Sequence, residues 1–294
     1  MNEAVQNRLE GELRGAILAV YAFFVSAAYA SPYIRILDYY HMIEKPFVFR
    51  QLSIWGVTLL QSMGPDSVTA SYLFFGLGGI LLFYSLLYAF TLWQIGHAEI
   101  WTVALLAAFV VLFYAYPKPY DMLTAAFFTL AIVTLARNQL SAYLVIFFLS
   151  SLNKETTILL LPVFMIHYWR RLHPRQYWLL ALIQAVTFVT MQGTIRFIFR
   201  DAPGSSFWFS PVKNIADHWI YLSTSLLSLA AIVPLLWLVF RQWRYKPMLL
   251  RTAFVVLAPV LAILYFVAGR PFEFRVFAEM YSVTALLALP QRWL

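Results

Sequence analysis

Long, uninterrupted apolar runs recur along the whole chain, and they limit the fold more than any other feature. A membrane-crossing helix needs roughly 20 apolar residues to traverse about 30 Å of hydrocarbon. Residues 68–94, 177–198 and 249–268 each supply such a run. The runs are continuous rather than alternating, which favours helices over the strands of a membrane barrel. Because 62% of the residues are hydrophobic and only 12% are charged, the sequence predicts an all-α polytopic integral membrane protein.

About ten spans can be placed, and we expect one transmembrane domain over residues 1–294. The first apolar run is long for a signal peptide, so we expect an uncleaved anchor. An amphipathic stretch from Phe47 to Met63 follows and is expected to lie along the membrane interface. The ten predicted spans are 15–33, 68–94, 99–116, 121–137, 139–152, 156–169, 177–198, 215–240, 249–268 and 276–291.

Basic residues are concentrated in alternate loops, which predicts the orientation. The loops around Arg170-Arg171 and from Arg241 to Lys246 are strong markers of the cytoplasmic side. With these loops and both termini inside, nearly all of the formal net charge of +8 lies in the cytoplasm. This distribution fits membrane orientation, so we expect no nucleic-acid partner. We expect a multi-pass protein of the plasma (inner) membrane whose site faces outside.

The sharpest polar feature is the segment Ser151-Leu152-Asn153-Lys154-Glu155-Thr156 between two apolar runs. The preceding span has about 14 residues, or about 21 Å at 1.5 Å per residue, so Lys154 and Glu155 should lie below the outer surface. Ionisable residues at that depth usually serve function. The alternative is a structural ion pair that locks a tight helix hairpin.

Three further groups on the predicted outer side carry charge. Arg275 and Glu279 are spaced to share one face of the last span, either as part of a site or as one intrahelical salt bridge. Arg196 and Arg200 have the same spacing, which suits phosphate binding or simple snorkelling at a helix end. The remaining outer candidates are Asp38, Glu44, Arg50, Arg270 and Glu273. The chain has no cysteine, which excludes thiolate chemistry, and no metal-binding motif is evident.

These elements resemble small bacterial members of the GT-C superfamily of integral membrane glycosyltransferases. The resemblance rests on Pro46 to Leu52 in the first loop, on Asn153 to Thr156, and on the spacing of Arg275 and Glu279. It implies a GT-C-like bundle, with an interfacial helix in the first outer loop, that takes sugar from a polyprenyl-phosphate donor outside the membrane.

The same resemblance implies roles for particular residues. An acidic residue of the first outer loop, Asp38 or its substitute Glu44, would act as base, and Glu155 is a third catalytic candidate. The expected substrate- and phosphate-binding residues are Arg50, Lys154, Arg196, Arg200, Arg270, Glu273, Arg275 and Glu279. The expected partners are membrane lipid, a lipid-linked sugar donor and a glycan, lipid or protein acceptor. Some GT-C enzymes use a divalent metal, so metal dependence stays open. A transporter or flippase and a non-catalytic assembly subunit are the alternatives.

Overall fold

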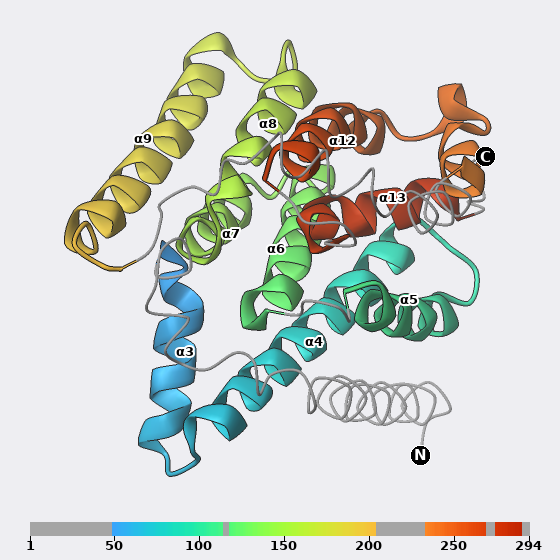
Figure 1. Cartoon of the computed structure of the whole chain (residues 1–294). Helices are drawn as coiled ribbons and strands as arrows, with labels where there is room; N and C mark the ends of the chain where they lie inside the picture. The colour runs from blue at the N-terminus through green and yellow to red at the C-terminus, as the bar shows by residue number, and fades with distance from the viewer. Residues whose placement is uncertain (1–48, 114–117, 204–232, 269–273, 290–294) are drawn as a thin grey trace, which may run out of the picture.

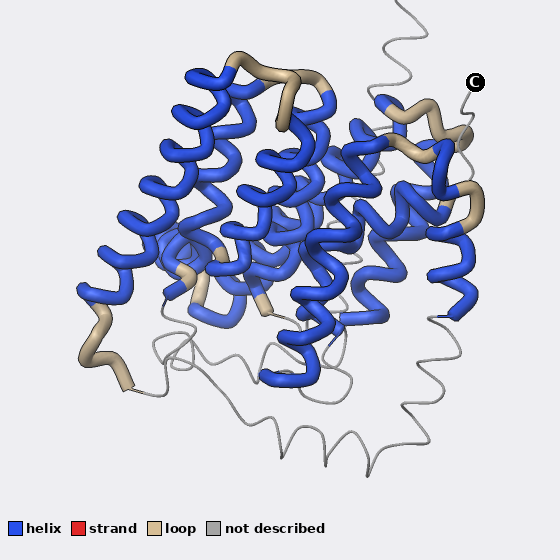
Figure 2. Tube along the Cα trace, turned by 90° about the horizontal axis from the view of Figure 1, so that it is seen from above, coloured by secondary structure: helices blue, strands red, loops and turns tan. Residues whose placement is uncertain are grey.

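The computed structural model describes residues 49–113, 118–203, 233–268 and 274–289. Every regular element in these ranges is a helix, as Figure 2 shows. The first predicted span, 15–33, lies outside the described residues, as does most of the span predicted at 215–240, of which only the helical segment 233–240 is described.

Among the described residues, three helices are long and apolar enough to cross a membrane: α4 (Ser67–Leu92), α9 (Pro174–Ile198) and α12 (Met248–Ala268). They coincide with predicted spans, so the prediction of a helical chain with membrane-crossing segments is confirmed at this level. Shorter apolar helices occupy the other predicted spans that lie within the described residues. They are α5 (Ala98–Phe113), α6 (Pro119–Ala136), α7 (Leu140–Asn153), α8 (Leu160–Tyr168) and α13 (Tyr281–Ala288).

Helices α4 and α6 form the centre of the bundle and run in the same direction. Gly78 of α4 lies against Met122 near the start of α6, and further along α4 the Tyr88 ring lies 4.9 Å from the Arg137 guanidinium, just past the end of α6. A Cβ atom at Gly78 would meet the Met122 Cβ at 3.0 Å. The glycine therefore permits a close helix crossing, as small residues commonly do in membrane bundles.

Helices α7 and α8 form an antiparallel hairpin. The rings of Tyr143 and Phe164 stack with their centroids 5.9 Å apart, and nearer the turn the Ser150 and Thr157 hydroxyls are hydrogen-bonded at 2.7 Å. Residues 139–169 are thus two helices joined by a turn, as predicted, and not a single kinked span. The turn contains the segment Asn153 to Thr156.

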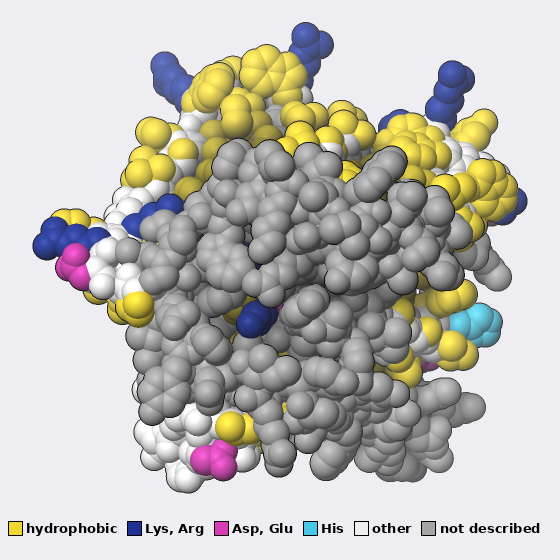
Figure 3. All heavy atoms as spheres, viewed as in Figure 1, with side chains coloured by type: hydrophobic (Ala, Val, Ile, Leu, Met, Phe, Trp, Pro, Cys, Tyr) yellow, Lys and Arg dark blue, Asp and Glu magenta, His cyan; other side chains and the backbone are white. Residues whose placement is uncertain are grey.

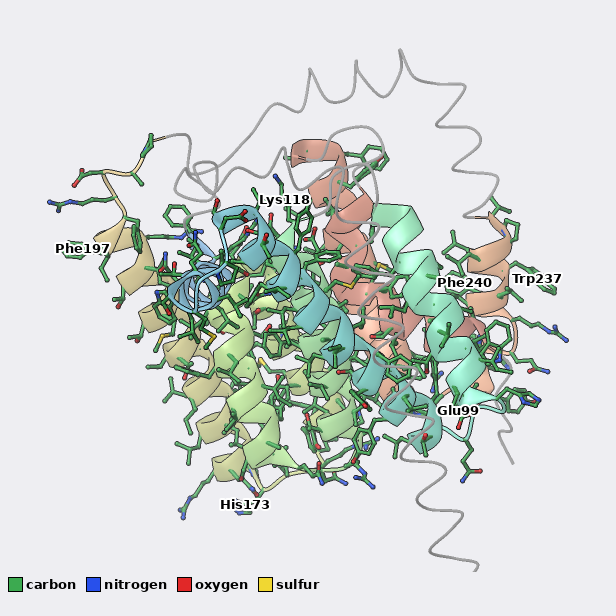
Figure 4. The ribbon with its side chains drawn as sticks, turned by 90° about the horizontal axis from the view of Figure 1, so that it is seen from below. Glu99, Lys118, His173, Phe197, Trp237 and Phe240 are labelled. Atoms are coloured by element: carbon green, nitrogen blue, oxygen red, sulfur yellow. The ribbon has the colours of Figure 1, made fainter. Side chains whose placement is uncertain are left out.

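The hairpin and the directions of its neighbours give the bundle two distinct ends. Figure 4 shows Lys118, just before α6, at one edge of the molecule, and His173 and Glu99 at the opposite edge. The turn at Asn153 lies at the Lys118 end, because α7 runs antiparallel to α6. We call this the α6 N-terminal end.

Helix α3 (Gln51–Ser62) lies across the α6 N-terminal end and corresponds to the predicted amphipathic stretch. It is seen end-on in Figure 4, in which α9 runs lengthwise. Ser53 and Val57 face the protein, whereas Trp55 and Leu59 are exposed. Gly56 contacts the Phe74 ring of α4 so closely that a larger residue would require the ring to move. This contact fixes α3 against the bundle.

The loop from Arg241 to Lys246 at the opposite end contains an unexpected buried cation. The Lys246 ammonium donates hydrogen bonds to the carbonyls of Leu238 and Val239, at 2.8 and 2.6 Å, and to the carbonyl of Leu287 in α13. The last carbonyls of a helix have no partner within it. Lys246 donates hydrogen bonds to such carbonyls in two different helices. This residue, predicted as a marker of the cytoplasmic side, is therefore also a buried cap.

Candidate functional site

A break in the helical backbone places the central residues of the site. Helix α7 ends at Asn153, Lys154 adopts an extended conformation with φ −157° and ψ 143°, and the 3-10 helix η3 (Glu155–Leu159) begins immediately after it. Because Lys154 is extended, the side chains of Lys154 and Glu155 point in different directions and contact different partners.

Asn153 anchors this break to neighbouring helices. Its side-chain amide donates to the Thr124 hydroxyl at 2.9 Å and to the Tyr120 carbonyl at 3.3 Å, and its side-chain oxygen accepts from Ser53 at 3.2 Å. The side chain is fully buried. One amide thus ties together α3, α6 and the end of α7.

Arg50, just before α3, reaches the break from the other side. Its guanidinium donates to a Glu155 carboxylate oxygen at 3.1 Å and to the Tyr120 hydroxyl, and it lies 4.1 Å from the centroid of the Tyr120 ring. Pro119 occupies the first turn of α6, where its fixed φ favours helix initiation, and Tyr120 follows it. The neighbouring Asp121 accepts the backbone N–H of Lys118 at 3.0 Å, which agrees with the expected role of an acid at a helix N-terminus.

Lys154 is paired with a buried acid. Its ammonium lies 2.7 Å from Glu279 Oε1, and the Thr156 hydroxyl donates to the same oxygen at 2.5 Å. Glu279 belongs to the 3-10 helix η5 (Phe274–Met280), and its side chain is 0% exposed. The pair joins the hairpin turn to the last part of the chain.

The two glutamates differ in access to solvent. The Glu155 side chain is 34% exposed, whereas the Arg50 and Lys154 side chains are each 8% exposed. Glu155 Oε2 has no hydrogen-bond partner among the described residues. Glu155 is therefore a carboxylate with one oxygen held by Arg50 and a second oxygen that is itself buried and unpaired among the described residues.

A further cation lies beside this cluster at the end of α9. The Arg196 guanidinium lies 5.2 Å from the centroid of the Phe49 ring, and Phe49 packs with Leu152 and Ile195. Arg196 is exposed and makes no ion pair with a described residue. Since Phe49 directly precedes Arg50, the aromatic contact places this guanidinium next to the cluster.

Gln192, one turn before Arg196 in α9, is hydrogen-bonded to the α7–α8 hairpin. It is buried, and its amide donates to the Ser151 carbonyl at 2.7 Å. The bond satisfies one of the last carbonyls of α7, which have no partner within the helix.

The structure brings four predicted site residues together in two ion pairs. Arg50, Lys154, Glu155 and Glu279 form two ion pairs at one break, and we call them the two-pair cluster. Arg200 instead pairs with Asp201 at 3.3 Å, and both side chains are largely exposed. Asp38, Glu44, Arg270 and Glu273 lie outside the described residues, and Arg275 is placed in η5 by its backbone alone.

The predicted spacing of Arg275 and Glu279 on one α-helical face is wrong. Residues 274–280 form a 3-10 helix, in which residues three apart lie above one another. The α-helical geometry on which the four-residue spacing was based is therefore absent from residues 274–280. Glu279 is bound by Lys154 and Thr156 instead.

Sequence reasoning did not select Tyr120, Thr124, Ser53 or Gln192, each of which contacts the break. Tyr120 follows the sequence Pro117-Lys118-Pro119, and this turn signal at a helix start was the clue to its position. The others resemble ordinary polar residues of apolar helices and carry no local signal.

Within the described ranges, no group of three or more His, Asp and Glu side chains could hold a metal ion. The site is thus a cluster of carboxylates and cations at one end of a helical bundle whose longest helices can cross a membrane. No family model matches this chain, and no curated protein or solved structure shows significant similarity to it.

Proposed function

We propose that this protein is a GT-C-like glycosyltransferase that transfers sugar from a polyprenyl-phosphate donor to a hydroxyl acceptor. In this proposal the chain has ten spans in the plasma membrane, both termini are cytoplasmic, and the two-pair cluster faces outside. The observation that carries the proposal is the state of Glu155. One carboxylate oxygen is held by Arg50, and the other is buried without a partner among the described residues, at the edge of a side chain that is 34% exposed as a whole.

In this proposal Glu155, which its ion pair with Arg50 keeps ionised, is the general base. The acceptor O–H proton would pass to Glu155 Oε2 while the acceptor oxygen forms a bond to the anomeric carbon of the sugar. The bond from that carbon to the phosphate oxygen breaks, and polyprenyl phosphate leaves with the electron pair. A positioned base of this kind typically contributes 10²–10⁴-fold to the rate.

The leaving phosphate requires a cation, and the contacts favour Arg196 for that role. Lys154 is neutralised by Glu279, and Arg50 by Glu155. Arg196 has no carboxylate partner among the described residues, and its stacking on Phe49 fixes the position of the guanidinium. Guanidinium groups bind phosphate through paired N–H donors.

The test is sugar transfer from a synthetic polyprenyl-phosphate sugar by the purified full chain, with donor binding measured separately. Glu155→Gln keeps an oxygen for Arg50 but removes the base, so turnover should fall by about 10²–10⁴-fold while donor affinity stays within about twofold of wild type. The matched control is Asp66→Asn. Asp66 caps α4 at the same end of the bundle by accepting the Thr69 N–H at 2.6 Å, and asparagine caps equally well.

Asp38→Asn separates the two candidate bases. If this change abolishes transfer while Glu155→Gln is fully active, the base is the loop residue that the GT-C resemblance indicates, and our assignment of Glu155 is wrong. If the purified protein neither binds nor turns over any lipid-linked donor, the glycosyltransferase proposal itself fails. Donor movement across a vesicle membrane without transfer would support a flippase instead.

A further inference from the structure

The end of the bundle opposite the two-pair cluster carries a second group of cations with no function in the proposed reaction. Arg171 follows α8, and its guanidinium lies 3.2 Å from His167 Nε2 and 3.7 Å from the Met248 sulfur at the start of α12. Both partners are uncharged acceptors. The Arg171 charge is therefore not neutralised by any described residue.

The contact with Arg171 also defines the state of His167. A guanidinium only donates hydrogen bonds, so Nε2 must be the acceptor and Nδ1 must carry the proton of a neutral imidazole. This Nδ1 is buried and has no partner among the described residues. The ring orients Arg171 without competing for an anion.

Arg251 lies three residues after Met248 on α12, which places both side chains on one helix face. Its Nε is buried, has no hydrogen-bond partner, and belongs to a side chain without an ion pair in the described part of the chain. Two guanidinium groups therefore approach the same junction of α8 and α12. An unpaired, partly buried charge is costly, so this junction favours an anion.

The helix surface below Arg251 indicates which anion. Val255, Pro259, Ile263 and Phe266 are exposed, and their spacing continues the stripe that begins at Arg251. The stripe runs over about 22 Å at 1.5 Å per residue, which exceeds the roughly 15 Å half-thickness of the hydrocarbon core. An arginine at the head of an apolar stripe matches a molecule with a phosphate head and acyl chains. Figure 3 shows Lys and Arg side chains projecting from the apolar surface near the α8–α9 turn.

We propose that Arg171 and Arg251 bind the phosphate of an anionic phospholipid, with an acyl chain lying along the exposed stripe of α12. Basic pockets between membrane helices are suited to such headgroups. This site lies at the opposite end from the two-pair cluster, and it stands whether or not the protein transfers sugar.

The experiment measures binding of phosphatidylglycerol, phosphatidylcholine and inorganic phosphate to the full chain in detergent by native mass spectrometry. Phosphatidylglycerol should bind at least tenfold more tightly than either other probe. Arg251→Gln should raise its dissociation constant about tenfold, because a charge-assisted hydrogen bond is lost. Arg175→Gln is the matched control: Arg175 is exposed in the first turn of α9 at the same end, and its loss should change affinity by less than twofold.

Three results would overturn the proposal. Equal weakening by Arg175→Gln would mean that diffuse surface charge attracts the lipid. Equal binding of inorganic phosphate would remove the role of the apolar stripe, and equal binding of phosphatidylcholine would remove the role of net headgroup charge. Elution of each variant as a single folded peak excludes loss of binding through unfolding.

Discussion

The Lys154 ammonium and the Glu279 carboxylate lie 2.7 Å apart, on side chains that are 8% and 0% exposed. This relationship distinguishes Lys154 from Glu155, although the two residues are adjacent and were expected to act together. Lys154 holds the hairpin turn against η5, while one Glu155 oxygen is buried and has no partner among the described residues. Lys154 is thus one partner of a buried ion pair, as the structural alternative describes, whereas a functional role for Glu155 stays a prediction.

We predict that Lys154→Met and Glu279→Leu each destabilise the protein strongly. Removing one partner of a buried pair leaves an uncompensated charge and typically costs about 3–5 kcal/mol. The double variant should recover much of this loss because neither charge remains. Thermal unfolding followed by fluorescence-detected size exclusion gives all three values, and strictly additive losses would show that the pair is not coupled.

Asn153→Ala should lower stability by about 1–3 kcal/mol, since it leaves buried polar groups of α3 and α6 without partners. The Asn153 side chain makes three hydrogen bonds, to Tyr120, Thr124 and Ser53. Thr124→Val removes one of them and should cost less than Asn153→Ala. The midpoint of thermal unfolding measures both, and an unchanged midpoint for Asn153→Ala would contradict the anchoring role.

Lys246→Met should destabilise the protein, whereas Arg244→Met should not. Lys246 is buried and donates to three helix-end carbonyls, while Arg244 lies two residues away and is exposed. Both substitutions remove one positive charge from the same loop, so any effect on membrane orientation is matched. A fall in the unfolding midpoint of both variants by the same amount would point to charge alone.

The membrane orientation is tested by reporter fusions at the two ends of the bundle. The α7–α8 hairpin places the loop after α8 on the opposite side from the end of α9. Fusions after Arg175 and Lys246 should report the cytoplasm, and a fusion near Ser205 should report the outside. The reverse pattern would place the two-pair cluster in the cytoplasm and rule out transfer on the outer face.

The helical character of the chain could be predicted because the long apolar runs of α4, α9 and α12 leave few alternatives in a bilayer. The hairpin at Asn153 was also predictable, because a short polar segment separates two apolar runs. The ion-pair partners of the site residues could not be predicted from the sequence. Arg50 and Glu155, or Lys154 and Glu279, are far apart in sequence, and only the packing of α3 and η5 against the turn brings them together.

The error at Arg275 and Glu279 has a physical origin. Sequence spacing has meaning only for a specified helix type, and an apolar segment gives the same hydrophobic signal whether its first turns are α or 3-10. The short helix η5 places Glu279 toward Lys154 and not along an α-helical stripe. The helix type and the distant partner of Glu279 are both properties that residue patterns do not reveal.

The cap formed by Lys246 has a consequence for the order in which the chain is assembled. Two of its acceptors, Leu238 and Val239, are synthesised before it, but the third, Leu287, follows 41 positions later. Lys246 can therefore complete its hydrogen bonds only after α13 has been synthesised and has packed against it. Without α13, the Lys246 ammonium would keep only its hydrogen bonds to the Leu238 and Val239 carbonyls, so the docking of α13 is what completes this buried cap.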